Sequence, residues 1–241
     1  MNKIDKLKEM IKECNNIVFF GGAGVSTASG LPDFRGKDGL YKKKNKYDFP
    51  PEYLLSSRCF YENTKLFYEY YKENMNCLKY KPNIVHKVLK ELEDEGKLKA
   101  VITQNIDGLH TKAGSKIVYE IHGTVNRGHC IKCNKEYDGK YIFKDNEVPK
   151  CSCGGIVKPD VVLYGEMLPD EAFSNASKAI YKADMLIVAG TSLTVYPASG
   201  LVNYFNGRYL VIINNDKTNF DDQANLVIND DLVKVFTKIT K

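Results

Sequence analysis

The stretch FFGGAGVSTASGLPDFRG, residues 19–36, decides the fold. An apolar run ends there in three closely spaced glycines, Gly21, Gly22 and Gly24. Glycines after a buried strand let the backbone approach a pyrophosphate, and the N–H groups that open the next helix favour an anion. The stretch therefore predicts a dinucleotide site. A tight turn between strand and helix remains the alternative, because Thr27 stands at the sixth position of the pattern and no acid follows at a strand end about twenty residues on.

Near-continuous apolar runs recur along the chain after residues 17–20. Such runs are typical of strands that are covered on both faces of a parallel sheet. Helical patterns lie between them, as at 84–92 and 170–183, and this alternation predicts a doubly wound α/β fold. The further strand candidates are 98–105, 116–123, 159–165, 183–190 and 209–215.

Two stretches interrupt the alternation, and we interpret them as insertions that form a smaller module. Residues 37–80 are rich in Tyr and Lys and have part-helical spacing, whereas residues 128–158 are rich in turns and cysteine. The large domain then comprises residues 1–36, 81–127 and 159–241.

Two close cysteine pairs lie in the second insertion. They are Cys130-x2-Cys133 and Cys151-x-Cys153. Four thiolates in two pairs match a closed tetrahedral Zn²⁺ site, which is structural because no coordination position stays open. A short polar insertion has too little core to fold without such a link. The alternatives are four thiols without a metal, or His129 in place of one cysteine.

The composition and net charge of the chain limit the partners and the compartment that we expect for it. The chain is 43% hydrophobic and 27% charged with a formal net charge of +5, which is ordinary for a globular protein and too weakly basic to indicate nucleic acid. The N-terminal segment lacks the apolar core of a signal peptide, and no apolar run is long enough to cross a bilayer. We therefore expect a cytoplasmic protein with reduced thiols and with neither membrane nor nucleic-acid partners.

Polar side chains follow several of the predicted strands. Asn105 and Asp107 follow one strand, His122 ends the next, and Thr191 and Asn214 follow two later ones. The carboxyl ends of parallel strands share one edge of the sheet, where ligands bind in open α/β folds. A lone histidine at a strand end is more often structural, so the whole set carries the prediction of a site.

These motifs together resemble the sirtuins, the NAD-dependent protein-lysine deacylases, of bacterial type. The resemblance covers nearly the whole chain in the family's order. It implies a Rossmann-like NAD-binding domain with a smaller zinc-bearing domain. It also implies an enzyme that consumes NAD to deacetylate lysine in proteins or peptides, releasing nicotinamide and 2′-O-acetyl-ADP-ribose. The motifs are GAGVSTASGLPDFRG, TQNIDGLH, the HG at His122, the cysteine pairs, PDVVLYGE, GTSLTVYPA and IINN.

The resemblance implies a role for each matching residue. His122 and Asn105 are the implied catalytic residues, with His122 as general base, a task that suits a neutral imidazole. Phe34 is implied to shield the reacting sugar from water. The implied NAD contacts are Gly22, Ala23, Gly24, Ser26, Thr27, Asp33, Phe34, Arg35, Gln104, Asn105, Ile106, Asp107, Gly190, Thr191, Ser192, Asn214 and Leu232. The implied peptide contacts, made by strand addition, are Leu163, Tyr164, Gly165, Glu166, Leu193 and Val195.

The acyl group is expected to be uncharged, with acetyl first. Sirtuins that prefer succinyl or malonyl groups carry a Tyr-x-x-Arg pair. The corresponding stretch here has Tyr68 and Tyr71 but no arginine, and Lys72 is a poor geometric substitute. The alternatives are removal of longer apolar acyl chains, ADP-ribosyl transfer to protein, and a non-catalytic NAD sensor whose zinc module binds nucleic acid. His122 and the peptide segment favour deacylation.

Overall fold

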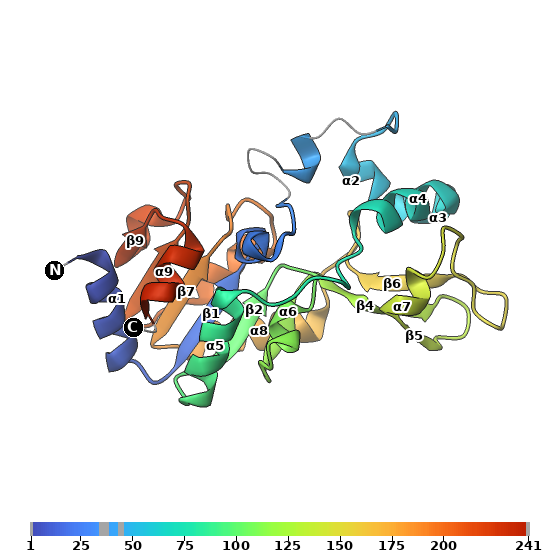
Figure 1. The fold of residues 1–241 in the computed structure, drawn as a ribbon. Helices are drawn as coiled ribbons and strands as arrows, with labels where there is room; N and C mark the ends of the chain where they lie inside the picture. The colour runs from blue at the N-terminus through green and yellow to red at the C-terminus, as the bar shows by residue number, and fades with distance from the viewer. Residues whose placement is uncertain (1, 34–38, 43–45, 240–241) are drawn as a thin grey trace.

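The computed structural model describes residues 2–33, 39–42 and 46–239 of the chain. A large and a small sheet lie side by side, and both chain ends are on the side of the large sheet (Figure 1). All neighbours in the large sheet are parallel, in the order β3-β2-β1-β7-β8-β9. This is the doubly wound order, so the predicted fold class is confirmed. The strands are β1 (Ile17–Gly21), β2 (Leu98–Thr103), β3 (Val118–Glu120), β7 (Met185–Ala189), β8 (Tyr209–Ile213) and β9 (Leu226–Ile228).

Helices cover both faces of this sheet. On one face lie α1 (Lys3–Glu13), α5 (Ile84–Asp94) and α9 (Leu232–Ile239); on the other lie α8 (Asp170–Lys182) and the 3₁₀ segment Ala198–Tyr204. Successive side chains of a strand point to opposite faces. In β1, Ile17 and Phe19 accordingly pack with the first set of helices, while Val18 and Phe20 pack with the second. Burial on both sides explains the continuous apolar runs in the sequence.

The helix α5 shows how the local sequence specifies an element. Asn83 caps its N-terminus by accepting a hydrogen bond from the N–H of Val85, which satisfies one donor that the helix itself leaves unpaired. Val88 and Leu92 then recur on the buried side, which is the helical stripe seen in the sequence. Short helices complete the large domain: α6 (Leu109–Lys112) and the 3₁₀ turns Ala23–Val25, Thr27–Ser29 and Asp221–Gln223.

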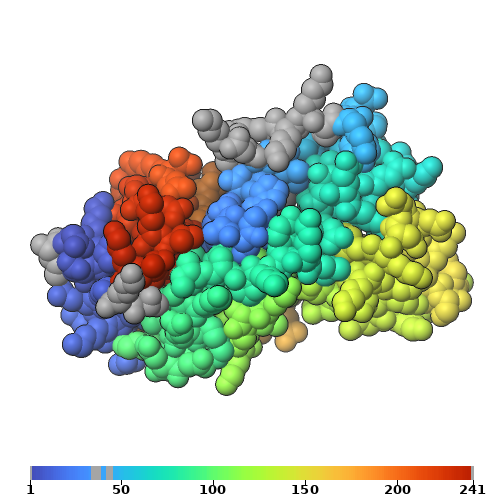
Figure 2. Space-filling model, in the orientation of Figure 1, coloured from blue at the N-terminus to red at the C-terminus, as the bar shows by residue number. Residues whose placement is uncertain are grey.

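The small module combines the two insertions around a core of its own. Its antiparallel sheet has the order β5-β4-β6, and the aromatic residues Phe60, Phe67 and Tyr68 of its helices share one core with Val157 of that sheet. Figure 2 shows these two parts of the chain, teal and yellow, packed together at the end opposite α1. The elements are α2 (Pro51–Leu54), α3 (Ser57–Glu62), α4 (Thr64–Asn74), β4 (Gly123–Cys130), β5 (Glu136–Asp138), α7 (Gly139–Ile142) and β6 (Val157–Val161), with a 3₁₀ turn at Leu40–Lys42.

One predicted strand belongs to a different sheet. The run 159–165 was expected in the parallel sheet, but β6 covers 157–161 and pairs antiparallel with β4. The pairing partner is set by the tertiary fold, and a short apolar run does not reveal it. Both β4 and β6 continue beyond the insertion 128–158, so they connect the small module directly to the large domain. In the part of the chain that the structure describes, no helix is long and apolar enough to span a membrane.

Candidate active site

A pocket of about 480 Å³ lies at the carboxyl edge of the parallel sheet, lined by loops that follow β1, β2, β3, β7 and β8. The predicted edge site is therefore assembled as expected from open α/β folds. Among the predicted residues, Gly22, Ser26, Asp107 and Leu193 do not line the pocket, and Phe34 and Arg35 lie outside the described residues. Those that line it are Ala23, Gly24, Thr27, Asp33, Gln104, Asn105, Ile106, His122, Leu163, Tyr164, Gly165, Glu166, Gly190, Thr191, Ser192, Val195, Asn214 and Leu232.

The glycine loop after β1 packs directly on the loop after β7. The Gly24 N–H donates to the Gly190 carbonyl at 2.8 Å, and the Gly22 N–H donates to the Ala189 carbonyl at 3.1 Å. A Cβ on Gly24 would lie 2.8 Å from the Gly190 Cα, so a side chain there would push the two loops apart. The sequence suggested approach to a pyrophosphate as the reason for these glycines. In the structure, contact between the loops on either side of the β1–β7 switch point already requires them.

A buried polar network lies beside the pocket. The Ser26 hydroxyl donates to Asp107 Oδ2 at 2.7 Å, and Asn105 Nδ2 donates to Ser26 Oγ at 3.1 Å. Asp107 Oδ1 accepts from the Leu109 N–H at 2.8 Å. Burial raises the pKa of Asp107, while the hydrogen bonds from Ser26 and Leu109 oppose that rise. The network fixes the loop after β2 and holds Asn105 at the pocket wall.

His122 is held by hydrogen bonds to the segments that follow β2 and β6. Its Nδ1 lies 2.9 Å from the Gln104 carbonyl oxygen. A carbonyl only accepts, so Nδ1 carries the proton of the neutral ring and Nε2 is the basic nitrogen. The His122 carbonyl accepts from the Val162 N–H at 3.0 Å. The next residue, Gly123, has φ +77°, and a Cβ on it would lie 1.9 Å from the Asp160 carbonyl oxygen, so only glycine fits.

The segment after β6 forms another wall of the pocket. The Tyr164 N–H donates to the Leu55 carbonyl at 3.1 Å, and the Ser57 N–H donates to the Tyr164 carbonyl at 2.9 Å. One edge of this segment is therefore already paired with the small module. Val195 lines the same pocket, whereas Leu193 is buried.

Several pocket residues were not in the predicted set. Asp216 and Lys217 follow Asn214 at the end of β8, and the strand-end signal would have found them. Tyr41 and Met75 come from the first insertion, and only the tertiary fold brings them to the pocket.

The three residues that bear on the expected acyl preference, Tyr68, Tyr71 and Lys72, lie in different surroundings. Tyr71 lines the pocket and is fully buried, and burial raises its pKa well above the ordinary value for tyrosine. The Tyr68 hydroxyl instead donates to the Val157 carbonyl. Lys72 Nζ donates to the carbonyls of Asp145 and Glu147 at 2.7 and 2.6 Å. Its ammonium is thus fixed at another loop and does not line the pocket.

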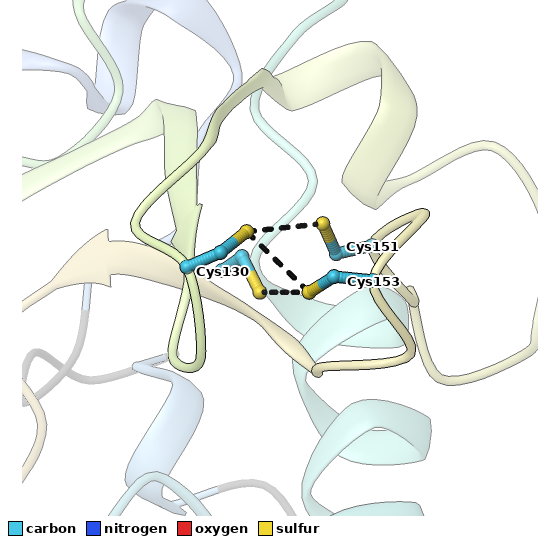
Figure 3. Close-up of side chains that lie close together, drawn as sticks. Cys130, Cys151 and Cys153 are labelled. Atoms are coloured by element: carbon cyan, nitrogen blue, oxygen red, sulfur yellow. Dashed lines mark hydrogen bonds between the residues drawn. The ribbon is translucent and has the colours of Figure 1, made fainter.

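The four predicted cysteines form one cluster in the small module (Figure 3). Their sulfur atoms all lie within 4.8 Å of one another, with Cys130–Cys153 and Cys133–Cys151 Sγ distances of 3.5 Å. Tetrahedral coordination with Zn–S bonds of about 2.3 Å places sulfurs about 3.8 Å apart. A hydrogen bond from the Cys153 N–H lowers the pKa of the Cys151 thiol, whereas the neighbouring thiols raise the pKa of Cys133. The cluster fits a closed structural zinc site.

Comparison with known proteins covers almost the entire chain. The Sir2 family matches residues 22–197. The NAD-dependent protein deacetylase of Clostridium acetobutylicum is 52% identical over 241 residues, covering 99% of this chain and 98% of its own length. The protein of the same name from Clostridium perfringens is 55% identical over 240 residues, with the same coverage of both chains.

Solved structures also match nearly the whole length of this chain. A variant Sir2 with a deacetylated p53 peptide and 3′-O-acetyl ADP ribose has a TM-score of 0.90 at 39% identity, covering 99% of this chain and 98% of that chain. A complex of Sir2 with a p53 peptide and NAD⁺ has a TM-score of 0.86 at 37% identity, with the same coverage.

Proposed function

This chain belongs to the Sir2 family, and from that premise we propose which of its residues carry out the reaction. The protein is an NAD-dependent protein deacetylase that acts on acetylated lysine peptides and yields an acetyl-ADP-ribose. NAD is the co-substrate: it supplies the ribose that accepts the acetyl group and the nicotinamide that leaves. The observation that carries the assignment is the meeting of His122, Gln104 and Asn105 at one pocket wall.

We propose His122 as the general base. Its Nδ1 proton is directed to the Gln104 carbonyl, which leaves Nε2 to take a proton from a ribose hydroxyl. Such help typically accelerates a reaction ~10²–10⁴-fold. Gln104 and Asn105 provide a polar but uncharged wall, which suits a sugar that gains positive charge as nicotinamide leaves. Asp107 acts from behind this wall, through Ser26 and the loop that carries Ile106.

The NAD contacts follow from the same pocket. We propose that Ala23, Gly24 and Thr27 contact the diphosphate of NAD. Ser192 and Asn214 contact its adenosine half. The peptide pairs between the segment 163–166 and residues 193–195, where main-chain hydrogen bonds supply affinity. We also propose NAD contacts for the other predicted residues: Gly22, Ser26, Asp33, Phe34, Arg35, Ile106, Asp107, Gly190, Thr191 and Leu232.

The supporting parts of the molecule complete the proposal. Residues 1–36, 81–127 and 159–241 form the NAD-binding domain, and residues 37–80 and 128–158 form the small domain, with β4 and β6 as the links between them. Cys130, Cys133, Cys151 and Cys153 are the ligands of a structural zinc ion. The enzyme acts in the cytoplasm, and acetyl is the preferred acyl group over longer apolar chains.

The replacement His122→Ala tests the central assignment. We expect the variant to lose deacetylation by at least the ~10²-fold typical of a missing general base, because alanine has no group that can take the proton. NAD binding, measured by titration calorimetry, should persist, which separates a chemical defect from a binding defect. Mass spectrometry of the wild-type products should show acetyl-ADP-ribose. Near-wild-type turnover by the variant would refute the role of His122, and an ADP-ribosylated protein as main product would favour a transferase.

A further inference from the structure

Lys158 is a half-buried lysine on β6, outside the pocket, whose amine reaches the segment that follows its own strand. Its Nζ lies 3.1 Å from Glu166 Oε2 and donates to the Val161 carbonyl at 3.3 Å. The side chains of Lys158 and Glu166 are 20% and 25% exposed. An ion pair this sheltered is screened less by water than a surface pair.

Glu166 extends these contacts along the segment. The same Oε2 accepts from the Leu163 N–H at 2.9 Å, and the Glu166 N–H donates to the Leu163 carbonyl at 2.9 Å. Hydrogen bonds therefore link Lys158 to Val161 and Glu166, and Glu166 to Leu163, around the turn. Without Lys158, the Glu166 carboxylate would lose the charge that holds it above the Leu163 amide.

These hydrogen bonds matter because the segment 161–166 has one edge already paired. Tyr164 in its middle already pairs with Leu55 and Ser57 on one edge. An added peptide strand has only the opposite edge to use, and it gains most when that edge is already ordered. Fixing both ends of the turn leaves little backbone freedom to be lost when the peptide binds.

We propose that Lys158 is a positioning residue for the peptide substrate: through Glu166 it holds the segment 161–166 in the shape that accepts a peptide strand. This rests on the proposed function, in which that segment pairs with the acetylated peptide. The consequence is specific. Lys158 assists substrates whose flanking residues pair with the segment, and it does not assist an acetyl-lysine that lacks flanking residues.

The test compares Lys158→Met and Lys158→Arg with the wild type on two substrates: an acetylated peptide of about ten residues and an acetyl-lysine with blocked termini. Loss of a charge-assisted hydrogen bond predicts a KM for the long peptide that is raised about tenfold in Lys158→Met. The kcat, the KM for NAD and the KM for the blocked acetyl-lysine should stay near wild type. Arginine retains the charge and the donors, so Lys158→Arg should restore most of the affinity for the long peptide.

Lys65→Met is the matched control, because Lys65 is an exposed lysine of α4 that pairs with Glu69 of the same helix; it should leave both substrates unaffected. Glu166→Gln is the second variant, and it should also raise the KM for the long peptide, because it removes the carboxylate through which Lys158 acts. Zinc content and thermal unfolding show whether each variant is folded. An unchanged KM in folded Lys158→Met, or equal loss on both substrates, overturns the proposal. A wild type that releases no nicotinamide with either substrate would refute the proposed function itself, and the inference with it.

Discussion

His86 and His110 are two buried imidazoles that pack on each other, with 4.6 Å between their ring centroids. His86 Nδ1 accepts from the Asn83 N–H, which places its proton on Nε2. Within the described ranges, His86 Nε2 and both nitrogens of His110 lack hydrogen-bond partners. Burial lowers the pKa of His86 to about 4 and the pKa of His110 well below its ordinary value. Both rings are therefore neutral near pH 7.

This pair predicts a loss of stability in mild acid. Below pH 6.5 these histidines bind protons in the unfolded chain. In the folded chain, His86 binds a proton only near its lowered pKa of about 4. Folding therefore becomes less favourable as the pH falls through this range. The limiting slope is about 1.4 kcal/mol per pH unit for each histidine. Urea unfolding between pH 7 and pH 5 should show a smaller loss of unfolding free energy in His86→Gln than in the wild type. Equal losses in the two proteins would contradict this account.

Single residues divide into those that the sequence reveals and those that only packing reveals. Asn105 and His122 were predicted because strand ends converge at one edge, a rule that needs only the order of elements. Lys158 and Tyr41 gave no such signal, because where a long side chain ends depends on neighbours far away in sequence. Phe34 was predicted as a shield, and that role stays a prediction.

The helix α4 shows how neighbouring residues take unrelated roles. Its aromatic side packs in the small core, where Tyr71 stacks on Phe67 and Phe143. Lys72 lies one position on, and its side chain is 8% exposed and turned to the loop 145–147. Burial is the main cause of the lowered pKa of Lys72, and the Asp145 carboxylate opposes that shift. The charge is stabilised by this carboxylate and by the loop carbonyls that accept hydrogen bonds from Nζ.

The replacement Lys72→Met should therefore change stability and not acyl preference. We expect a loss of about 1–3 kcal/mol of unfolding free energy, because the carbonyls of Asp145 and Glu147 lose their donor. The ratio of kcat/KM values for acetyl- and succinyl-lysine peptides should stay as in the wild type. A selective fall in succinyl activity would mean that Lys72 binds the acyl carboxylate after all.

Strands were easier to recognise than to place. The runs of β1, β7 and β8 have apolar residues on both faces, which predicted a covered parallel sheet. The run of β6 looks similar, yet it pairs antiparallel with β4. The strand β9 has only three residues, Leu226–Ile228, and so short an apolar stretch carries no periodicity to detect.

At the scale of the molecule, we expect the small module to depend on its cysteine cluster for folding. Cys130 and Cys151 are part of the same core as Phe60 and Tyr68. The sheet β5-β4-β6 is short, and a structural zinc contributes folding free energy to a module of this kind. The large domain has its own two cores on either side of the parallel sheet.

Zinc removal should therefore unfold one part of the molecule before the other. After treatment with a strong chelator, hydrogen exchange should rise in β4, β5 and β6 while β1, β7 and β8 stay protected. Deacetylation should fall in parallel, because Tyr164 pairs with residues of the small module. Added Zn²⁺ should restore both properties. Unchanged exchange in β4 after full metal removal would show that the cluster is dispensable.

The close approach of Gly123 to the Asp160 carbonyl has a consequence for mutagenesis surveys. Two adjacent positions, His122 and Gly123, would both score as intolerant in a survey that records only growth or activity. The causes are unrelated, since one position carries the imidazole and the other has no room for a Cβ. A survey that also records protein abundance would separate them, with full abundance at the first position and depletion at the second.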